Sequence, residues 1–145
     1  MRRNCSQNPN FRIDGLGNFT GGGANDRGIW TFVNDPNATL TNAEIVFFFN
    51  RSNLSFTNGS QAGWSNLVRD QALDGTSPAN GYYAYRATYT GTWTYFPQYQ
   101  AWSADGDPYW STNIGSCNSG ISGYARRTLT VNGETITFTR GPVSV

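Results

Sequence analysis

Aromatic residues keep to every second position between Tyr83 and Tyr95, and this alternation is the strongest constraint on the fold. One parity of the stretch holds Tyr83, Tyr85, Ala87, Tyr89, Gly91, Trp93 and Tyr95, and the other is mostly threonine. A period of two with one aromatic and one polar face predicts a half-buried β-strand or hairpin. Two arrangements keep the rings on one face. One is a three-residue turn over 90–92 that sets Tyr89 opposite Trp93, and the other is a straight passage with a bend at Gly91.

The composition favours an all-β domain with an unusual core. Leu, Ile, Val and Phe make up only 27 of the 145 residues, yet the formal net charge is +1 and aromatic residues reach 15%. A low aliphatic share with high charge would predict disorder, but here the rings can supply the buried surface. Gly, Asn, Thr and Ser are abundant, and strong helix formers are scarce. We expect a compact antiparallel sandwich or barrel-like domain with long loops over 28–145, and an extended arm or loops over 1–27.

Two further strand patterns are clear. The apolar run at 44–50 is continuous rather than alternating, which predicts a central strand buried on both faces, with 53–57 as a candidate partner. In the stretch 128–139, Asn132-Gly133 lies between alternating residues. This pattern predicts a hairpin in which Val131 pairs with Glu134, because Asn-Gly accepts the left-handed conformation at both turn positions.

The remaining stretches have weaker signals. Residues 28–33 are a strand candidate, and 97–126 have the Gly and Pro content of a long, loop-rich excursion. At most one short helix is expected, at about 65–73, with Ser65 as its N-cap and Asp74-Gly75 at its end.

Missing residue types exclude several chemistries. The chain has ten Arg but no Lys and no His, so His-based triads and dyads, a lysine Schiff base and a lysine-containing phosphate loop are all absent. No metal-ligand spacing occurs, and we expect neither a metal nor a cofactor. No basic run exceeds two residues, which argues against nucleic-acid binding. Asp105 and Asp107 could serve a small glycosidase or bind Ca²⁺, but a polar turn before Pro108 is the better interpretation. The sequence therefore argues against an enzyme.

Two features concern the compartment. Cys5 and Cys117 could form one disulfide bond closing nearly the whole chain, or remain two free thiols. The N-terminal stretch 1–17 starts with basic residues but contains no apolar segment, so we expect no secretion signal. The longest strictly apolar run, Ile45–Phe49, is far too short to span a membrane, so no membrane partner is expected.

Exposed aromatic and arginine side chains are the candidates for a binding surface. Large rings and Arg are the residue types that dominate protein interfaces, and rings also stack on sugars. The alternative is that most rings form the core, with Trp102 and Trp110 the main exceptions because they lie in the loop-rich part. The candidate residues for a protein interface or for sugar stacking are Trp93, Tyr95, Tyr99, Trp102, Tyr109, Trp110, Arg2, Arg3 and Arg12.

The composition is typical of an extracellular protein, whereas the N-terminus is typical of a cytosolic one, and a virus particle reconciles the two. In composition the whole chain resembles the small β-rich accessory proteins of tailed bacteriophage virions, namely capsid decoration or cement proteins and fibre domains. The resemblance implies a non-enzymatic protein that is made in the host cytoplasm and located in the virion. It also implies that a homo-oligomer binds the major capsid protein at a symmetry axis and stabilises the shell. The alternative is a carbohydrate-binding module or receptor-binding fibre domain that uses exposed Trp and Tyr.

Overall fold

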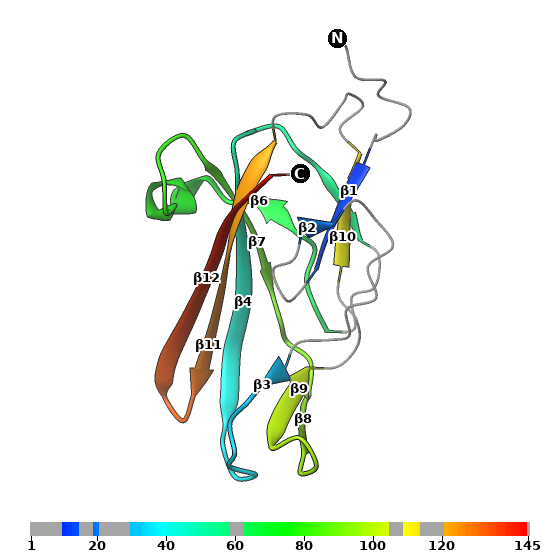
Figure 1. Ribbon diagram of the computed structural model, residues 1–145, viewed down its shortest axis with the longest axis vertical. Helices are drawn as coiled ribbons and strands as arrows, with labels where there is room; N and C mark the ends of the chain where they lie inside the picture. Colours follow the sequence, from blue (N-terminus) through cyan, green and yellow to red (C-terminus); the bar gives the residue numbers. More distant parts are fainter. Residues whose placement is uncertain are drawn as a thin grey trace.

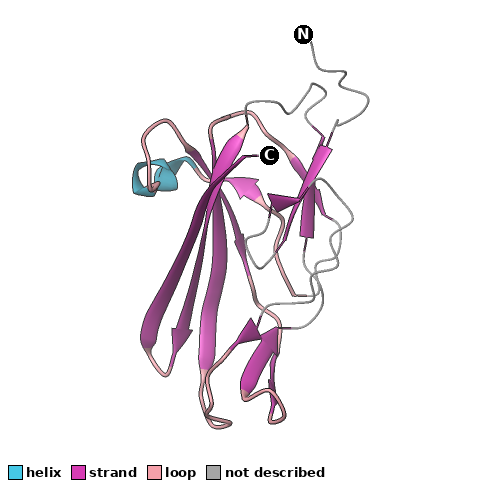
Figure 2. Cartoon of the chain, in the orientation of Figure 1, coloured by secondary structure: helices cyan, strands magenta, loops and turns pink. Residues whose placement is uncertain are grey.

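The computed structural model describes residues 10–14, 19–20, 30–58, 63–104, 109–113 and 121–144. Over these residues the regular structure is almost all β-strand, as predicted, with one short helix (Figure 1, Figure 2). The elements are β1 (Asn10–Asp14), β2 (Phe19–Thr20), β3 (Trp30–Thr31), β4 (Leu40–Phe49), β5 (Phe56–Asn58), β6 (Val68–Arg69), the 3₁₀ helix η2 (Gln71–Thr76), β7 (Tyr83–Thr88), β8 (Trp93–Phe96), β9 (Ala101–Ala104), β10 (Tyr109–Asn113), β11 (Ser122–Val131) and β12 (Glu134–Ser144).

Three antiparallel sheets form the described part of the molecule. The large sheet has the strand order β12-β11-β4-β7-β6, and the two smaller sheets have the orders β2-β1-β10-β5 and β3-β9-β8. Figure 1 shows the long strands of the large sheet as one layer, with β1, β2 and β10 beside its upper half and β3, β8 and β9 beside its lower end. The η2 helix lies on the other side of the large sheet (Figure 2). The arrangement is a sandwich in which two small sheets cover one face of a large one.

Strand β4 lies at the centre of the large sheet, and its segment Ile45–Phe49 is buried on both faces, as the continuous apolar run predicted. Ile45 and Phe47 face the small sheets, whereas Val46 and Phe48 face the side of η2, and all four are 0% exposed. Apolar and polar residues do not alternate along such a segment, because neither of its faces meets water.

Aromatic side chains form a large part of the core between the layers. The Phe47 and Trp110 rings meet edge to face with centroids 6.2 Å apart, and Trp110 meets Trp64 in the same way at 5.9 Å. Phe49 and Tyr85 form another edge contact at 5.9 Å. Edge-to-face pairs contribute about 0.5–1.5 kcal/mol each beyond the area they bury. Rings therefore take the place of the missing aliphatic residues, as the composition indicated.

The predicted hairpin at 128–139 is confirmed in turn and register. Val131 pairs with Glu134 and Leu129 pairs with Ile136. Asn132 and Gly133 have φ angles of +51° and +83°, as a type I′ turn requires. Asn132 also exchanges two hydrogen bonds with Thr39, because its backbone N–H donates to Thr39 O and its Oδ1 accepts from Thr39 N, both at 2.9 Å. These bonds attach the turn to the start of β4.

The alternating aromatic stretch passes from one layer to the other, so the bend at Gly91 is realised and the hairpin is not. Strand β7 pairs with β4 and β6, whereas β8 pairs with β9. The ring parity is kept across the bend, since Tyr89 and Trp93 pack edge to face at 5.5 Å. Pairing of β7 with β8 is prevented because both neighbours of β7 in the large sheet are already present.

Strands that pair over long distances were missed by sequence analysis. Strands β1 and β2 lie within 1–27, where only an arm or loops were expected, and β1 pairs with β10 along its whole length. Strand β5 pairs with β10 and not with the 44–50 run. The excursion 97–126 contains β9, β10 and the start of β11. Strands β1 and β5 pair with β10, and β3 pairs with β9, over long stretches of sequence, so local patterns could not reveal these pairings. Strands β8 and β9 are neighbours in the chain, and the Gly and Pro content around them hid their hairpin.

The predicted helix at about 65–73 starts too early. Val68–Arg69 form strand β6, and the helix begins at Gln71. Ser65 is no N-cap, because its hydroxyl accepts a hydrogen bond from Thr88 N at 2.9 Å and donates to Asn66 O at 3.1 Å. The free edge of β7 draws this segment into the sheet and overrides its weak helical pattern.

Candidate binding site on the β8–β9 hairpin

Four of the nine candidate interface residues lie on one hairpin. Strands β8 and β9 carry Trp93, Tyr95 and Trp102, and the turn between them carries Tyr99. Arg12 lies on β1 and Tyr109 lies on β10, and the structure describes only the backbone of these two residues. Arg2, Arg3, Cys5, Cys117, Asp105 and Asp107 also lie outside the described residues.

Trp110 belongs to the core and cannot contact a partner, so its interpretation as an exposed ring was wrong. Its exposed fraction is 0%, and its ring packs against Phe47 and Trp64. Strand β10 lies between β1 and β5, and these two pairings fix the tryptophan against the large sheet. The neighbouring Gly and Pro residues, which suggested a loop, gave no sign of these partners.

A four-residue connection shapes the tip of the hairpin. Phe96 and Ala101 are the last paired residues, and Pro97-Gln98-Tyr99-Gln100 join them. Tyr99 N donates to Phe96 O at 3.1 Å, and Gln100 has a φ angle of +51°. Proline favours the second position of such a turn, because its fixed φ suits that position. The connection is therefore a defined turn that presents Tyr99 at its end.

The inner side of the hairpin is held by hydrogen bonds to the loop before β4. Tyr95 donates its hydroxyl to Asn34 Oδ1 at 3.0 Å, and Trp102 donates Nε1 to the Asp35 carbonyl at 3.0 Å. The loop is itself closed, because Asp35 Oδ1 accepts from Asn37 N at 2.9 Å. The Tyr95 and Trp102 rings are register partners whose centroids lie 5.3 Å apart. These contacts fix the direction of the hairpin.

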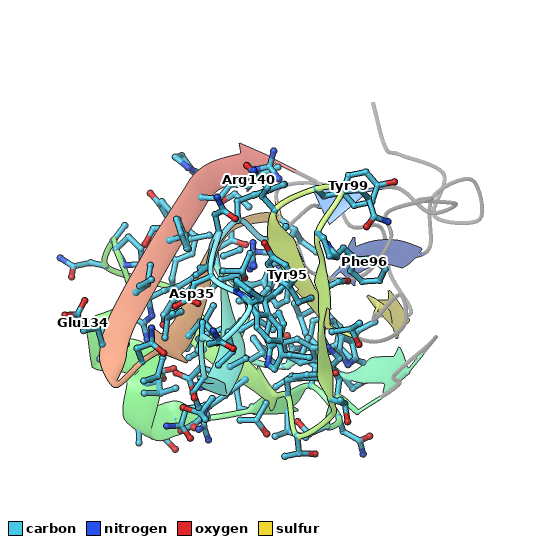
Figure 3. All side chains as sticks on the ribbon, turned by 90° about the horizontal axis from the view of Figure 1, so that it is seen from below. Asp35, Tyr95, Phe96, Tyr99, Glu134 and Arg140 are labelled. Atoms are coloured by element: carbon cyan, nitrogen blue, oxygen red, sulfur yellow. The ribbon has the colours of Figure 1, made fainter. Side chains whose placement is uncertain are left out.

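The outer side of the hairpin presents aromatic surface. Figure 3 shows Tyr95 on the side of β8 that faces the large sheet, and Phe96 and Tyr99 on the opposite side. The Phe96 and Tyr99 centroids are 6.4 Å apart with planes 43° apart, and Tyr99 is 58% exposed. Phe32, which follows the Trp102 partner Thr31, is 76% exposed. We call Phe96 and Tyr99 the outer aromatic patch.

Phe32 was missed by sequence reasoning. A phenylalanine inside the predicted strand 28–33 has the same signature as a core residue. In the structure the strand ends at Thr31, and a tight turn closed by Val33 N and Thr31 O leaves the Phe32 ring at the surface.

Trp93 lies apart from the patch, beside a hollow at the base of the hairpin. The hollow is small, and its lining includes Trp64, Trp93, Leu129 and Phe138. The Trp93 ring is half-buried and packs against the core. The four candidates on the hairpin therefore have different surroundings. Tyr99 is exposed, Tyr95 and Trp102 bond the hairpin to the loop before β4, and Trp93 packs at the margin of the core.

The described groups whose pKa values shift clearly are Arg69, Asp74 and Tyr85, and all three lie on β6, η2 and β7 rather than on the hairpin. Within the described residues, no three Cys, Asp or Glu side chains gather as a metal site would require. The hairpin therefore presents mainly aromatic surface, and the Tyr95 hydroxyl and Trp102 Nε1 are already used in bonds to the loop before β4.

Comparison of the chain with protein-family models, with curated proteins and with solved structures finds no match. Over the residues that the structure describes, no helix combines the length and the apolar character needed to cross a membrane.

Proposed function

We propose that this protein is a non-enzymatic structural protein of a virion, which binds the capsid surface and stabilises the shell as decoration or cement proteins do. The outer aromatic patch on the β8–β9 hairpin makes the contact. The partner is the major capsid protein, bound by several copies of the chain at a symmetry axis.

One observation carries this proposal: the exposed rings stand on a hairpin that is already held in place. The bonds from Tyr95 to Asn34 and from Trp102 to Asp35 join the hairpin to the rest of the molecule at two points. Binding therefore costs little conformational entropy, so the free energy gained by burying Phe96 and Tyr99 contributes mainly to affinity. Aromatic anchors on a rigid support are the usual centres of protein interfaces.

The ring geometry supports a protein partner over a sugar. A sugar platform needs flat, coplanar rings with polar groups free to bind hydroxyls, but the Phe96 and Tyr99 planes differ by 43°. The Tyr95 hydroxyl and the Trp102 N–H already donate within the molecule. Binding of glycans, as by a carbohydrate-binding module or fibre domain, is the alternative function that the test distinguishes.

The test begins with purified virus particles and then uses variants. We expect mass spectrometry to find the chain in particles, and we expect the purified chain to bind shells that lack it. Tyr99→Ala and Phe96→Ala should each weaken binding to shells by about thirtyfold, the effect of losing an aromatic anchor. Val68→Ala is the matched control, because Val68 is 55% exposed but lies on β6, and it should bind as the parent does.

Two results would overturn the proposal. One is absence of the chain from purified particles. The other is a change in tryptophan fluorescence on adding glycans that Tyr99→Ala abolishes, while shells are not bound, which would establish the carbohydrate-binding alternative.

A further inference from the structure

Strand β12 forms an edge of the large sheet, and none of the described strands pairs with its outer side. The two-residue turn makes Val131 and Glu134 a hydrogen-bonded pair, and such pairs alternate along a hairpin. Leu129–Ile136 and Arg127–Phe138 are therefore the next hydrogen-bonded pairs. The alternate residues Thr135, Thr137 and Thr139 belong to the other kind of pair, and their backbone N–H and C=O groups point away from β11. These groups form a row that a further strand can pair with.

The first seven residues of this edge lack the usual protection against pairing. Exposed edges are normally blocked by Lys, Pro or a bulge. In β12 the proline and the irregular pairing come only after Arg140, at Gly141-Pro142 and opposite Gly123/Ala125. Between Glu134 and Arg140 the sequence is Thr-Ile-Thr-Phe-Thr, which has high β propensity and no charge.

The edge also carries apolar surface on the face that looks toward the small sheets. Ile136 pairs with the buried Leu129 and packs against the core, and Phe138 lies on the same face with 55% of its surface exposed. Phe138 lines the small hollow at the base of the β8–β9 hairpin together with Trp64 and Trp93. A strand added to β12 would extend the sheet and place its own side chains beside Phe138.

We propose that the added strand is β12 of a second copy, in antiparallel pairing about a two-fold axis at Thr137. In this register Ile136 lies opposite Phe138 of the partner subunit, and Glu134 lies opposite Arg140 of the partner subunit. The two-fold axis repeats both contacts. The segment is symmetric about Thr137 in its apolar residues and antisymmetric in its charges, which an isologous contact requires.

The charges at the two ends of the segment favour a second copy of β12 as the added strand, and they also set the register of the pairing. Figure 3 shows Glu134 and Arg140 at opposite ends of this segment of β12. Moving the axis to Thr135 would set Glu134 against Ile136 of the partner subunit, and moving it to Thr139 would set Phe138 against Arg140 of the partner subunit. Only the axis at Thr137 pairs opposite charges and also pairs the apolar side chains. Opposite-charge and apolar pairs across antiparallel strands are the stabilising ones.

Charge exchange tests the contact on the isolated protein, so a failure here is distinct from a failure of the capsid proposal. We expect sedimentation velocity to show a monomer–dimer equilibrium. Glu134→Arg and Arg140→Glu, each alone, set like charges opposite one another twice, and each should weaken dimerisation by about tenfold. Mixing the two single variants restores both opposite-charge pairs in a heterodimer, and the double variant restores them in a homodimer.

Backbone pairing is tested separately with Thr137→Pro. It removes an N–H that points to the second copy while leaving the bonds between β11 and β12, so dimerisation should be lost with the fold retained by circular dichroism. Thr130→Val is the matched control, because Thr130 is on β11, away from the edge, and it should leave the dimer unchanged. A chain that stays monomeric at every concentration overturns the proposal. A dimer that is insensitive to the single charge changes, or is not restored in the mixture, overturns it as well.

Discussion

Arg69 and Asp74 form a two-pronged ion pair, in which Nη1 and Nη2 each donate to one carboxylate oxygen at 2.7 Å. The same carboxylate accepts a hydrogen bond from Ala84 N at 2.8 Å. The guanidinium carbon of Arg69 lies 5.3 Å from the centre of the Tyr83 ring. The pair thus joins η2 to strands β6 and β7 and holds the helix at the edge of the large sheet.

This ion pair predicts a loss of stability in acid. The hydrogen bonds from Arg69 hold the pKa of Asp74 below its ordinary value of 3.8. The unfolded chain therefore takes up this proton at a higher pH than the folded chain does. The contribution is fully present above a pH of about 4 and is lost as the pH falls through the folded pKa. Asp74→Asn should lower the free energy of unfolding by about 1 kcal/mol near neutral pH.

Urea unfolding at neutral and acidic pH measures the effect. The difference between parent and Asp74→Asn should shrink in acid. Asp70→Asn is the control, because its side chain makes no cap hydrogen bond to the helix. An equal loss from both variants would contradict the role of the pair.

Tyr85 connects the sheet to the loop after β4 and should be sensitive to removal of its hydroxyl. The hydroxyl donates to Arg51 O at 2.7 Å and accepts from Leu54 N at 3.2 Å, in a residue that is 0% exposed. Tyr85→Phe leaves both backbone groups without this partner, which should cost about 1–3 kcal/mol in thermal or urea unfolding. Tyr82→Phe, whose hydroxyl meets Ser122 at 2.8 Å in a partly exposed position, should cost less.

The same tyrosine predicts an alkaline limit to stability. Burial raises the pKa of Tyr85 above its ordinary value of 10.0. The unfolded chain therefore loses this proton first, and stability should fall as the pH rises from about 10 toward the folded pKa. Tyr85→Phe should reduce that fall, and an identical alkaline profile in the variant would count against the assignment.

Gly91 lets the chain cross between the layers, and no side chain fits there. A Cβ atom on Gly91 would lie 2.5 Å from the Tyr89 hydroxyl oxygen and 2.6 Å from its ring. The ring cannot move aside, because it packs against Trp64 and Trp93 and its hydroxyl donates to Thr92 O at 2.7 Å. Gly91→Ala should destabilise the fold by about 1–3 kcal/mol. Gly75→Ala, with no atom within 4 Å of the added Cβ, should be close to neutral in the same unfolding measurement.

Local chemistry explains which parts of the fold could be predicted from the sequence. The Asn132-Gly133 turn sets its own register, and the run Ile45–Phe49 can only be satisfied at the centre of a sheet. Both signals lie within a few residues, so no knowledge of the partners was needed. The parity of Tyr89 and Trp93 was predictable for the same reason, but the choice between hairpin and bend depends on β4 and β6, which occupy both sides of β7.

The same distinction between local signals and remote strand partners applies to the candidate site. Tyr99 lies in the turn that begins at Pro97, and its exposure is a local consequence of that turn. Burial of Trp110 and exposure of Phe32 depend on where β10 and β3 pair and end, which is decided by strands far away in the sequence. Composition correctly predicted a core made of rings but could not assign each ring to core or surface.

Trp110 and Phe32 should therefore respond to substitution in opposite ways. Trp110→Ala removes a ring that is 0% exposed and should lower the free energy of unfolding by about 3–5 kcal/mol. Trp110→Phe should cost less, because no described atom accepts a hydrogen bond from Nε1 and only part of the ring volume is lost. Phe32→Ala should change stability by no more than about 0.5 kcal/mol, since the ring is 76% exposed. Urea unfolding of the three variants measures the contrast, and equal losses from Trp110→Ala and Phe32→Ala would contradict the assignment of Trp110 to the core.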